Sequence, residues 1–200
     1  MGIIFEIGAN WGTDTVKFLA DPNNTVYAFE PIPHLIRHLD KELGKNQNLH
    51  LINAAIDIEN GWRNFNISDV SDWGVSSFYE FSDDIQTIWP GRDDFRWTDH
   101  RTNVMCMRLD TFMEWYSIPH IDYLWIDAQG NDFRVLKSLG DKIKTVKEGR
   151  CEVALSTELY KGTENTVSIV QPWLEEQGFT VTVQPDLCGG READLVFKRL

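Results

Sequence analysis

The chain has 200 residues, a length that suits one domain with a substantial hydrophobic core. Its formal net charge of −12 argues against nucleic acid or an anionic membrane surface as the main partner, because both repel a protein this acidic. A neutral or cationic small molecule is favoured instead.

Buried strands alternate with helices along most of the chain. Apolar runs predict the strands, and apolar residues at helical spacing predict the helices between them. The predicted strands cover residues 2–7, 25–30, 49–56, 121–127, 151–159, 179–183 and 193–197, and the predicted helices cover residues 13–20, 33–43, 132–140 and 166–177. This alternation is typical of an α/β protein with a parallel sheet covered on both faces. The connection between the last two strands is too short for a helix, so we expect them to pair antiparallel.

The alternation is interrupted for about 65 residues between residues 56 and 121, which is too long for an ordinary connection. Residues 62–68 and 103–109 have the pattern of an extended hairpin, and residues 110–116 predict a short helix. The stretch from Ser71 to His100 is irregular and acidic, and its many aromatic residues argue against disorder. We therefore expect an ordered insert, at about residues 62–108, that binds the substrate.

Cysteine spacing and hydropathy bear on metal binding, cellular compartment and membrane insertion. The three cysteines are odd in number and match no metal-ligand spacing, and Asp and His are scattered, so no metal site is predicted. We expect the cysteines to be reduced and the protein to be intracellular and cytoplasmic. No run approaches the roughly 18 apolar residues of a membrane helix, so membrane insertion is not expected. The oligomeric state is left open.

A glycine-rich turn follows the first predicted strand, in the stretch IIFEIGANWG. Gly8 and Gly12 let the chain turn tightly before a helix and let a ligand approach the backbone. Glu30 ends the second predicted strand, 22 residues after Gly8, where a carboxylate accepts both hydroxyls of a ribose. The turn and the acid, each at its own strand end, together predict a nucleoside-binding site.

Two nucleoside cofactors compete for this site. A dinucleotide fingerprint needs a glycine at the position of Asn10, whose side chain would crowd a pyrophosphate. S-adenosylmethionine has no phosphate and carries a positive sulfonium, which suits the acidic residues Glu6 and Asp14. Electrostatics therefore favours S-adenosylmethionine. An NAD-linked oxidoreductase of Rossmann type and a non-catalytic cofactor- or glycan-binding domain of the same fold remain alternatives.

Three stretches of the sequence resemble the successive motifs of the FkbM-type S-adenosylmethionine-dependent methyltransferases. They are FEIGANWG, VYAFEPIP and YLWIDAQGNDFRVLKSL, and the resemblance spans nearly the whole chain. The positions that match the family's third motif are Asp127, Gly130, Val135, Leu136 and Lys137, and those that depart from it are Trp125, Gln129 and Asp132. The resemblance implies a Rossmann-like class I methyltransferase whose seven-stranded, mostly parallel sheet has the order 3-2-1-4-5-7-6. Residues 1–200 would form a single domain, which begins at its first strand, as expected of a domain excised from a larger polypeptide.

The resemblance also implies a site and an activity. The residues that would bind the cofactor are Glu6, Gly8, Ala9, Asn10, Gly12, Glu30, Pro31, Ile32, Asn53, Ala54, Ala55 and Asp127. Of these, Glu30 would accept the ribose hydroxyls and Asp127 would face the cofactor amine or the methyl acceptor. Members of the family methylate hydroxyl oxygens, often on sugars, and need no metal. The implied function is O-methylation of a glycan or a glycosylated small molecule, with a deoxyhexose such as rhamnose or fucose as a candidate acceptor.

Methyl transfer to a sugar hydroxyl also requires a base and a surface for the sugar. Asp127 and Glu158 end predicted strands at the edge where the cofactor would lie, and His100 lies in the insert, so these three are the candidate bases. Aromatic planes pack on the C–H faces of sugars, and charged side chains bind the hydroxyls. The candidate residues for the methyl acceptor are Asp72, Trp73, Trp89, Arg92, Arg96 and Trp97. Several aromatic residues must instead anchor the insert, because a loop this long needs a small core of its own.

Overall fold

A seven-stranded sheet forms the centre of the computed structural model, which describes residues 2–68, 73–92, 96–155, 159–185 and 191–200. The strand order is β3-β2-β1-β7-β8-β10-β9. These strands are β1 (Ile3–Ile7), β2 (Thr25–Phe29), β3 (Leu49–Ile52), β7 (Ile121–Ile126), β8 (Val146–Ala154), β9 (Phe179–Pro185) and β10 (Glu192–Arg199). Neighbouring strands are parallel except β10, which is antiparallel to both β8 and β9. The predicted sheet order is confirmed.

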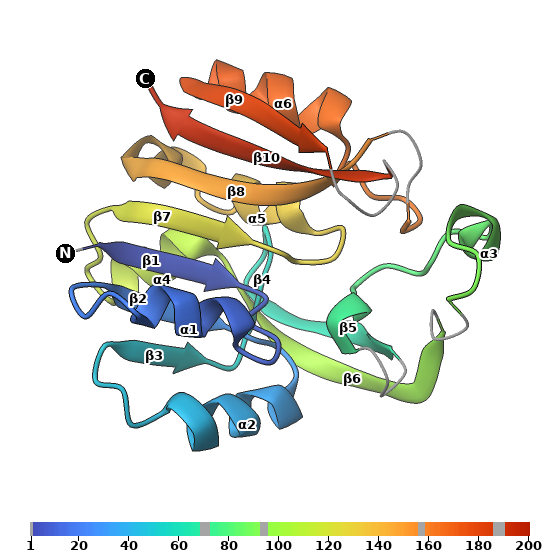
Figure 1. Ribbon diagram of the computed structural model, residues 1–200, viewed down its shortest axis with the longest axis horizontal. Coiled ribbons are helices and arrows are strands. Elements are labelled where there is room, and N and C mark those ends of the chain that lie inside the picture. The colour runs from blue at the N-terminus through green and yellow to red at the C-terminus, as the bar shows by residue number, and fades with distance from the viewer. Residues whose placement is uncertain (1, 69–72, 93–95, 156–158, 186–190) are drawn as a thin grey trace.

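Helices cover both faces of this sheet, so the fold has three layers (Figure 1). The helices are α1 (Thr13–Leu19), α2 (Pro33–Leu43), α4 (Leu109–Trp115), α5 (Asp132–Lys137) and α6 (Val167–Glu176). On one face, Phe18 of α1 and Leu39 of α2 pack against alternate residues of β1 and β2. On the other face, α4, α5 and α6 pack on a larger apolar cluster that contains Phe5 and Leu124. The main core therefore lies between the sheet and α4, α5 and α6.

Two of the predicted strands differ from the observed ones. Residues 49–56 form two short strands in different sheets, because Asn53 bends the chain by donating hydrogen bonds from Nδ2 to the carbonyl oxygens of Glu30 (2.9 Å) and Pro31 (3.1 Å). The strand predicted at residues 151–159 begins earlier and ends at Ala154. Its first half, VKEGR, carries charged residues at exposed and half-buried positions, so an apolar run does not reveal it.

The long interruption forms an ordered insert on the carboxyl side of the sheet. A second sheet has the order β4-β6-β5, with β4 at Ala55–Ile56, β5 at Gly61–Ser68 and β6 at Trp97–Met107. Strands β5 and β6 pair antiparallel, as the sequence predicts, although β6 begins earlier than expected. The stretch predicted to be irregular also contains a 3-10 turn, η1 (Trp73–Val75), and a short helix, α3 (Ile85–Ile88). In Figure 1 this insert projects from the side toward which the arrowheads of β1, β7 and β8 point.

The remaining 3-10 helix, η2 (Gly140–Thr145), connects α5 to β8.

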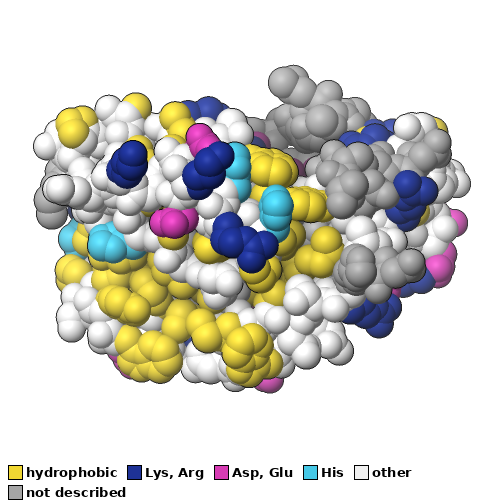
Figure 2. Space-filling view, turned by 90° about the horizontal axis from the view of Figure 1, so that it is seen from below, with side chains coloured by type: hydrophobic (Ala, Val, Ile, Leu, Met, Phe, Trp, Pro, Cys, Tyr) yellow, Lys and Arg dark blue, Asp and Glu magenta, His cyan; other side chains and the backbone are white. Residues whose placement is uncertain are grey.

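Apolar side chains gather on part of the surface, as the view from below shows (Figure 2). Large apolar side chains that are well exposed include Trp62 (71%), Trp115 (69%) and Tyr116 (63%). Among the described residues, no helix has the length and apolarity required to cross a membrane.

Candidate functional site

A cavity opens where the carboxyl ends of β1, β2 and β7 meet the insert. It encloses about 570 Å³ of empty space, part of it open to solvent. Its lining residues are Ile7, Gly8, Asn10, Phe29, Glu30, Pro31, Ile32, Leu35, Ala54, Ala55, Ile56, Phe65, Trp73, Gly74, Ser76, Phe78, Asp127, Ala128, Gln129 and Asn131. The cavity thus combines residues of the predicted cofactor edge with residues of the insert.

The turn after β1 has an unusual backbone. Gly8 and Asn10 both have positive φ, at 89° and 48°, and an asparagine tolerates this left-handed conformation better than most residues. A Cβ atom on Gly8 would lie 2.0 Å from the carbonyl oxygen of Asp127. Gly8 is therefore required by the close approach of β1 and β7. A Cβ atom on Gly12 would lie 2.6 Å from Leu39 Cδ2, so this glycine allows α1 and α2 to pack.

Glu30 is nearly fully buried in the cavity wall, directly after β2. The backbone N–H of Asn10 donates to its Oε2 at 2.9 Å, and that of Ile32 donates to its Oε1 at 2.8 Å. Burial raises the pKa of Glu30 to about 7, while these two hydrogen bonds favour the charged form. Each carboxyl oxygen keeps a lone pair free, so the group can still accept hydrogen bonds from a ligand.

Glu6, a second predicted cofactor residue, belongs to a different environment. Its carboxyl group is buried and accepts a hydrogen bond from Thr15 Oγ1 of α1 at 2.7 Å. Burial raises its pKa to about 8, although the hydrogen bond from Thr15 opposes this shift. Since Glu6 alternates with Phe5 and Ile7 along β1, it points to the α1 side of the sheet. Glu6, Ala9 and Gly12 lie outside the lining of the cavity, and their roles toward the cofactor stay predictions.

The opposite wall of the cavity is apolar. Pro31, Ile32, Ala54 and Ala55, which were all predicted to bind the cofactor, line it together. Asn53 does not line the cavity but supports this wall, because its side-chain amide holds the backbone that follows β2. The sequence therefore selected four residues that line this wall, and the role of each of them and of Asn53 toward the cofactor stays a prediction.

Asp127 follows β7 at the mouth of the cavity, where its carboxyl group is open to solvent. Protein atoms surround the group on its other sides, and this partial desolvation raises its pKa. Gln129 Nε2 donates to Asp127 Oδ1 at 2.7 Å, and Tyr160 Oη donates to Gln129 Oε1 at 2.7 Å. This chain of hydrogen bonds orients Asp127. The sequence missed the contribution of Tyr160, although the unusual residue Gln129 marked the position.

Only one of the predicted insert tryptophans lines the cavity, and this is Trp73. Its indole stacks on Trp11 of the turn after β1, with centroids 5.6 Å apart and an interplanar angle of 7°. The rings of Trp73 and His34 form a T-shaped pair with their centroids 4.8 Å apart. Trp11 and His34 are residues that sequence reasoning did not select, and only their proximity in space to Trp73 reveals them.

The other predicted tryptophans belong to a separate apolar cluster, which packs around Ile85, Leu159 and Tyr160. Trp97 stacks on Phe81 with centroids 3.9 Å apart, and its Nε1 donates to Glu80 Oε2 at 2.6 Å. Trp89 lies next to the guanidinium groups of Arg92 (5.8 Å) and Arg191 (5.6 Å). This cluster anchors the insert to the loop after β8.

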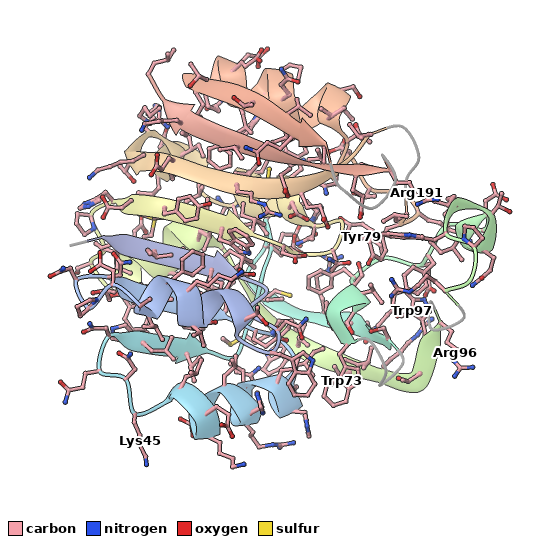
Figure 3. The ribbon with its side chains drawn as sticks, in the orientation of Figure 1. Lys45, Trp73, Tyr79, Arg96, Trp97 and Arg191 are labelled. Atoms are coloured by element: carbon pink, nitrogen blue, oxygen red, sulfur yellow. The ribbon has the colours of Figure 1, made fainter. Side chains whose placement is uncertain are left out.

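Several predicted residues lie where the structure gives no side-chain detail. Asp72 and Glu158 lie outside the described residues, and for His100 only the backbone is described, as part of β6. Arg96 lies on the insert beside Trp97 (Figure 3). Of the three candidate bases, Asp127 is therefore the one that the structure connects with the cavity. No group of three or more His, Cys, Asp or Glu side chains in the described part of the chain is arranged to hold a metal ion.

Two buried polar atoms without hydrogen-bond partners belong to residues that line the cavity, and they match the polar groups of a nucleoside. Within the described residues, the only two buried side-chain nitrogen or oxygen atoms without a hydrogen-bond partner are Asn10 Oδ1 and Trp73 Nε1. Both belong to residues that line this cavity. One is an acceptor and the other a donor, and leaving such atoms unpaired costs about 1–3 kcal/mol each. Together with the carboxyl group of Glu30, they match a ligand that carries both hydroxyl donors and ring acceptors.

Residues 6–182 match the model of the methyltransferase FkbM domain. The chain belongs to this family. It is also 26% identical over 163 residues to 2-O-methyltransferase NoeI of Sinorhizobium fredii (strain NBRC 101917 / NGR234), a match that covers 80% of this chain and 66% of NoeI. The family predicted from the sequence is therefore confirmed, and with it S-adenosylmethionine as the cofactor.

Solved structures with the same fold include several methyltransferases. SMU.1697c, a putative methyltransferase from Streptococcus mutans in complex with S-adenosylhomocysteine, matches with a TM-score of 0.52 and 14% identity over 100% of this chain and 89% of that one. The N-terminal domain of EvdMO1, in the presence of S-adenosylhomocysteine and D-fucose, matches with a TM-score of 0.51 and 12% identity over 99% and 76%. A putative rRNA methylase from Clostridium thermocellum has a TM-score of 0.56 at 9% identity over 100% and 89%. These likenesses confirm the predicted class I methyltransferase fold.

Proposed function

We propose that this chain is an S-adenosylmethionine-dependent O-methyltransferase that acts on a hydroxyl group of a sugar. The observation that carries the proposal is the cavity itself, which gathers the Glu30 carboxyl group, Asn10 and Asp127 at the carboxyl ends of adjacent strands. Glu30 would bind the ribose hydroxyls, and the apolar wall with Ile32 and Ala54 would hold the base. The chain spans 66% of the length of NoeI, so the activity of the whole protein is part of this proposal.

The cofactor supplies an activated methyl group on a sulfonium. The protein therefore has to align the acceptor and remove its proton. A bond forms between the acceptor oxygen and the methyl carbon as the carbon–sulfur bond breaks, and the hydroxyl proton passes to a base. Asp127 suits this role because its carboxyl group is accessible, its pKa is raised and Gln129 holds it in place.

A sugar is the methyl acceptor that the composition of the insert favours. Trp73 forms part of the cavity wall, and Trp89 and Arg92 lie farther out on the insert. The name of NoeI specifies 2-O-methylation, and the EvdMO1 domain was crystallised with D-fucose. A deoxyhexose or a glycoside that contains one is the first acceptor class to test.

The same proposal treats residues 1–200 as one methyltransferase domain with an acceptor-binding insert. We place its action in the cytoplasm, in agreement with the free, buried thiols of Cys106 and Cys151. We also propose a small acceptor rather than RNA. The net charge of −12 opposes a polyanionic substrate, although rRNA methylases share the fold.

Two measurements test this function. Titration calorimetry with S-adenosylmethionine and with NAD should give heat of binding for the first ligand and none for the second. Incubation with methyl-labelled cofactor and a panel of sugars and glycosides that includes rhamnose and fucose should then label at least one of them. Binding of NAD alone would favour an oxidoreductase, and tight cofactor binding without transfer to any sugar would favour a non-catalytic binding domain.

A further inference from the structure

Trp73 has a hydrogen-bond donor that no described residue uses. Its indole Nε1 is buried and has no partner, although the ring lines the cavity. By contrast, the indole nitrogen of Trp97 donates to Glu80, so the insert contains both a satisfied and an unsatisfied tryptophan. A buried indole N–H usually finds a partner. The missing partner of Trp73 points to a group on a ligand.

The surroundings of Trp73 indicate which part of the ligand this is. The cavity is polar near Gly8, Glu30 and Asp127 and apolar near Ile32, Leu35 and Phe65. These last three residues belong to an apolar cluster, and Trp73 packs against that cluster. A ribose and an amino acid tail require the polar end, whereas a flat, largely apolar base fits the other end. Trp73 therefore lies at the end of the cavity that suits the nucleobase.

Neighbouring rings hold the indole in a defined orientation. One face of Trp73 is covered by Trp11, and His34 meets the ring at an interplanar angle of 81°. Trp11 belongs to the turn after β1 and His34 to α2, so a loop of the sheet and a helix that covers it hold a side chain of the insert. In Figure 3, Trp73 lies beside α2, whereas Trp97 lies farther out toward α3. With one face occupied by Trp11, the unpaired indole N–H remains the polar group of Trp73 that is left for a base.

We propose that Trp73 is the residue through which the insert recognises the nucleobase of the cofactor, by a hydrogen bond from its indole N–H to a ring nitrogen. This inference rests on the proposed function, since it assumes that an adenine nucleoside occupies the cavity. An indole N–H can only donate. It therefore pairs with an unprotonated ring nitrogen of adenine and not with the exocyclic amine, which is a donor.

The experiment measures binding and needs no turnover. Calorimetry with S-adenosylhomocysteine is compared with three analogues, in which adenine N1, N3 or N7 is replaced by C–H. The proteins are the wild type, Trp73→Phe and, as a matched control, Trp115→Phe, which makes the same change at a surface position that is 69% exposed. We expect one analogue to bind the wild type and the control about 3- to 10-fold more weakly than S-adenosylhomocysteine does.

The decisive result is the pattern across the proteins. Trp73→Phe should bind S-adenosylhomocysteine more weakly than the wild type and should not distinguish it from that one analogue. If the wild type binds all four ligands equally, or if Trp73→Phe keeps the same discrimination, the proposed hydrogen bond is wrong. The first of these tests needs no variant, so a folding defect in Trp73→Phe cannot obscure it. A wild type that binds no S-adenosylhomocysteine would overturn the proposed function and this inference together.

Discussion

The carboxyl edge of the main sheet and the insert above it are built on different principles. At the edge, backbone geometry and buried carboxyl groups define the candidate site. Gly8 and Asn10 have positive φ, and two backbone N–H groups donate hydrogen bonds to the carboxyl group of Glu30. In the insert, aromatic rings and exposed ion pairs hold the chain, as in the stack of Trp97 on Phe81. One region is positioned by the sheet, and the other by side-chain packing.

This difference separates two roles, lining the cavity and anchoring the insert, which the sequence pattern alone did not distinguish. The predicted insert tryptophans looked like one surface for a sugar, but Trp73 joins the cavity while Trp97 belongs to the cluster that anchors the insert. In the proposed function the sheet edge therefore carries the chemistry, and the insert contributes one cavity wall and its own support. The following predictions test this division, starting with the largest expected effect.

Asp127→Asn tests whether the sheet edge supplies the chemistry. The variant keeps the size of the side chain but cannot take the proton of the acceptor hydroxyl. We expect kcat to fall by about 10²- to 10⁴-fold in a methyl-transfer assay. The affinity for S-adenosylhomocysteine, measured by calorimetry, should stay close to that of the wild type. A large loss of affinity with kcat intact would instead assign Asp127 to binding of the cofactor.

The buried acid beneath the edge gives the protein a dependence on pH. Burial raises the pKa of Glu6 from its ordinary value of 4.5 to about 8, so between these values the folded protein holds a proton that the unfolded chain has lost. This contribution to stability is complete below about pH 4.5 and is lost as the pH rises through about 8. The free energy of unfolding should therefore fall with rising pH relative to Glu6→Gln, which stays neutral and can still accept from Thr15.

The measurement is urea unfolding of the wild type and Glu6→Gln at pH 5 and pH 9. Each pKa unit corresponds to about 1.4 kcal/mol, so we expect the advantage of the variant to grow by about 3–5 kcal/mol between the two conditions. Comparison of the two proteins cancels the contributions of other titrating groups. Parallel pH profiles would show that Glu6 is charged in the folded protein.

Asp57 joins the two regions, and its removal should weaken that junction. Its carboxyl group is fully buried after β4 and accepts hydrogen bonds from Arg134 Nε of α5 at 2.6 Å and from Arg63 of β5. These partners hold its pKa below the usual range against the effect of burial. Asp57→Ala leaves two arginines without their partner. Since both retain contact with solvent, we expect the lower end of the cost of breaking a buried pair, about 3 kcal/mol.

The control for Asp57 is an ion pair on the surface. Lys17→Ala removes the contact between Lys17 and Asp14 on α1 and should change the free energy of unfolding by no more than about 1 kcal/mol. Denaturant unfolding measures both variants. Equal effects would mean that the buried junction does not hold the insert to the sheet.

Glu30→Ala tests the predicted contact with the ribose and has the smallest expected effect. Loss of the carboxyl group should weaken binding of S-adenosylhomocysteine by about 1–3 kcal/mol, because the ribose hydroxyls lose their acceptor. Calorimetry measures this directly, with Glu80→Ala in the outer part of the insert as the control, since Glu80 contacts Trp97 and Arg101 and does not line the cavity. Unchanged affinity would place the ribose elsewhere.

The sequence by itself determined the architecture and which residues lie at the carboxyl edge of the sheet. Apolar runs and helical spacing can be read within a short stretch of sequence. They therefore revealed the alternation of strands and helices and, through it, the order of the sheet. The residues after β1, β2 and β7 were found in the same way, because parallel strands bring their carboxyl ends to one edge. The single strand predicted at residues 49–56 was wrong. The hydrogen bonds of Asn53 that divide it join residues more than 20 positions apart, so a local pattern does not reveal them.

Only the tertiary structure decided which side chains share a space. Glu6 and Glu30 are both acids of neighbouring strands, yet Glu6 turns toward α1 and Glu30 lines the cavity. Trp73 and Trp97 are both insert tryptophans, and contacts with Trp11, His34 and the apolar cavity wall bring only Trp73 into the site. Such contacts join residues far apart in the chain, and their partners depend on the packing of whole elements. Local sequence patterns do not contain that information, because the packing forms only when the complete chain has folded.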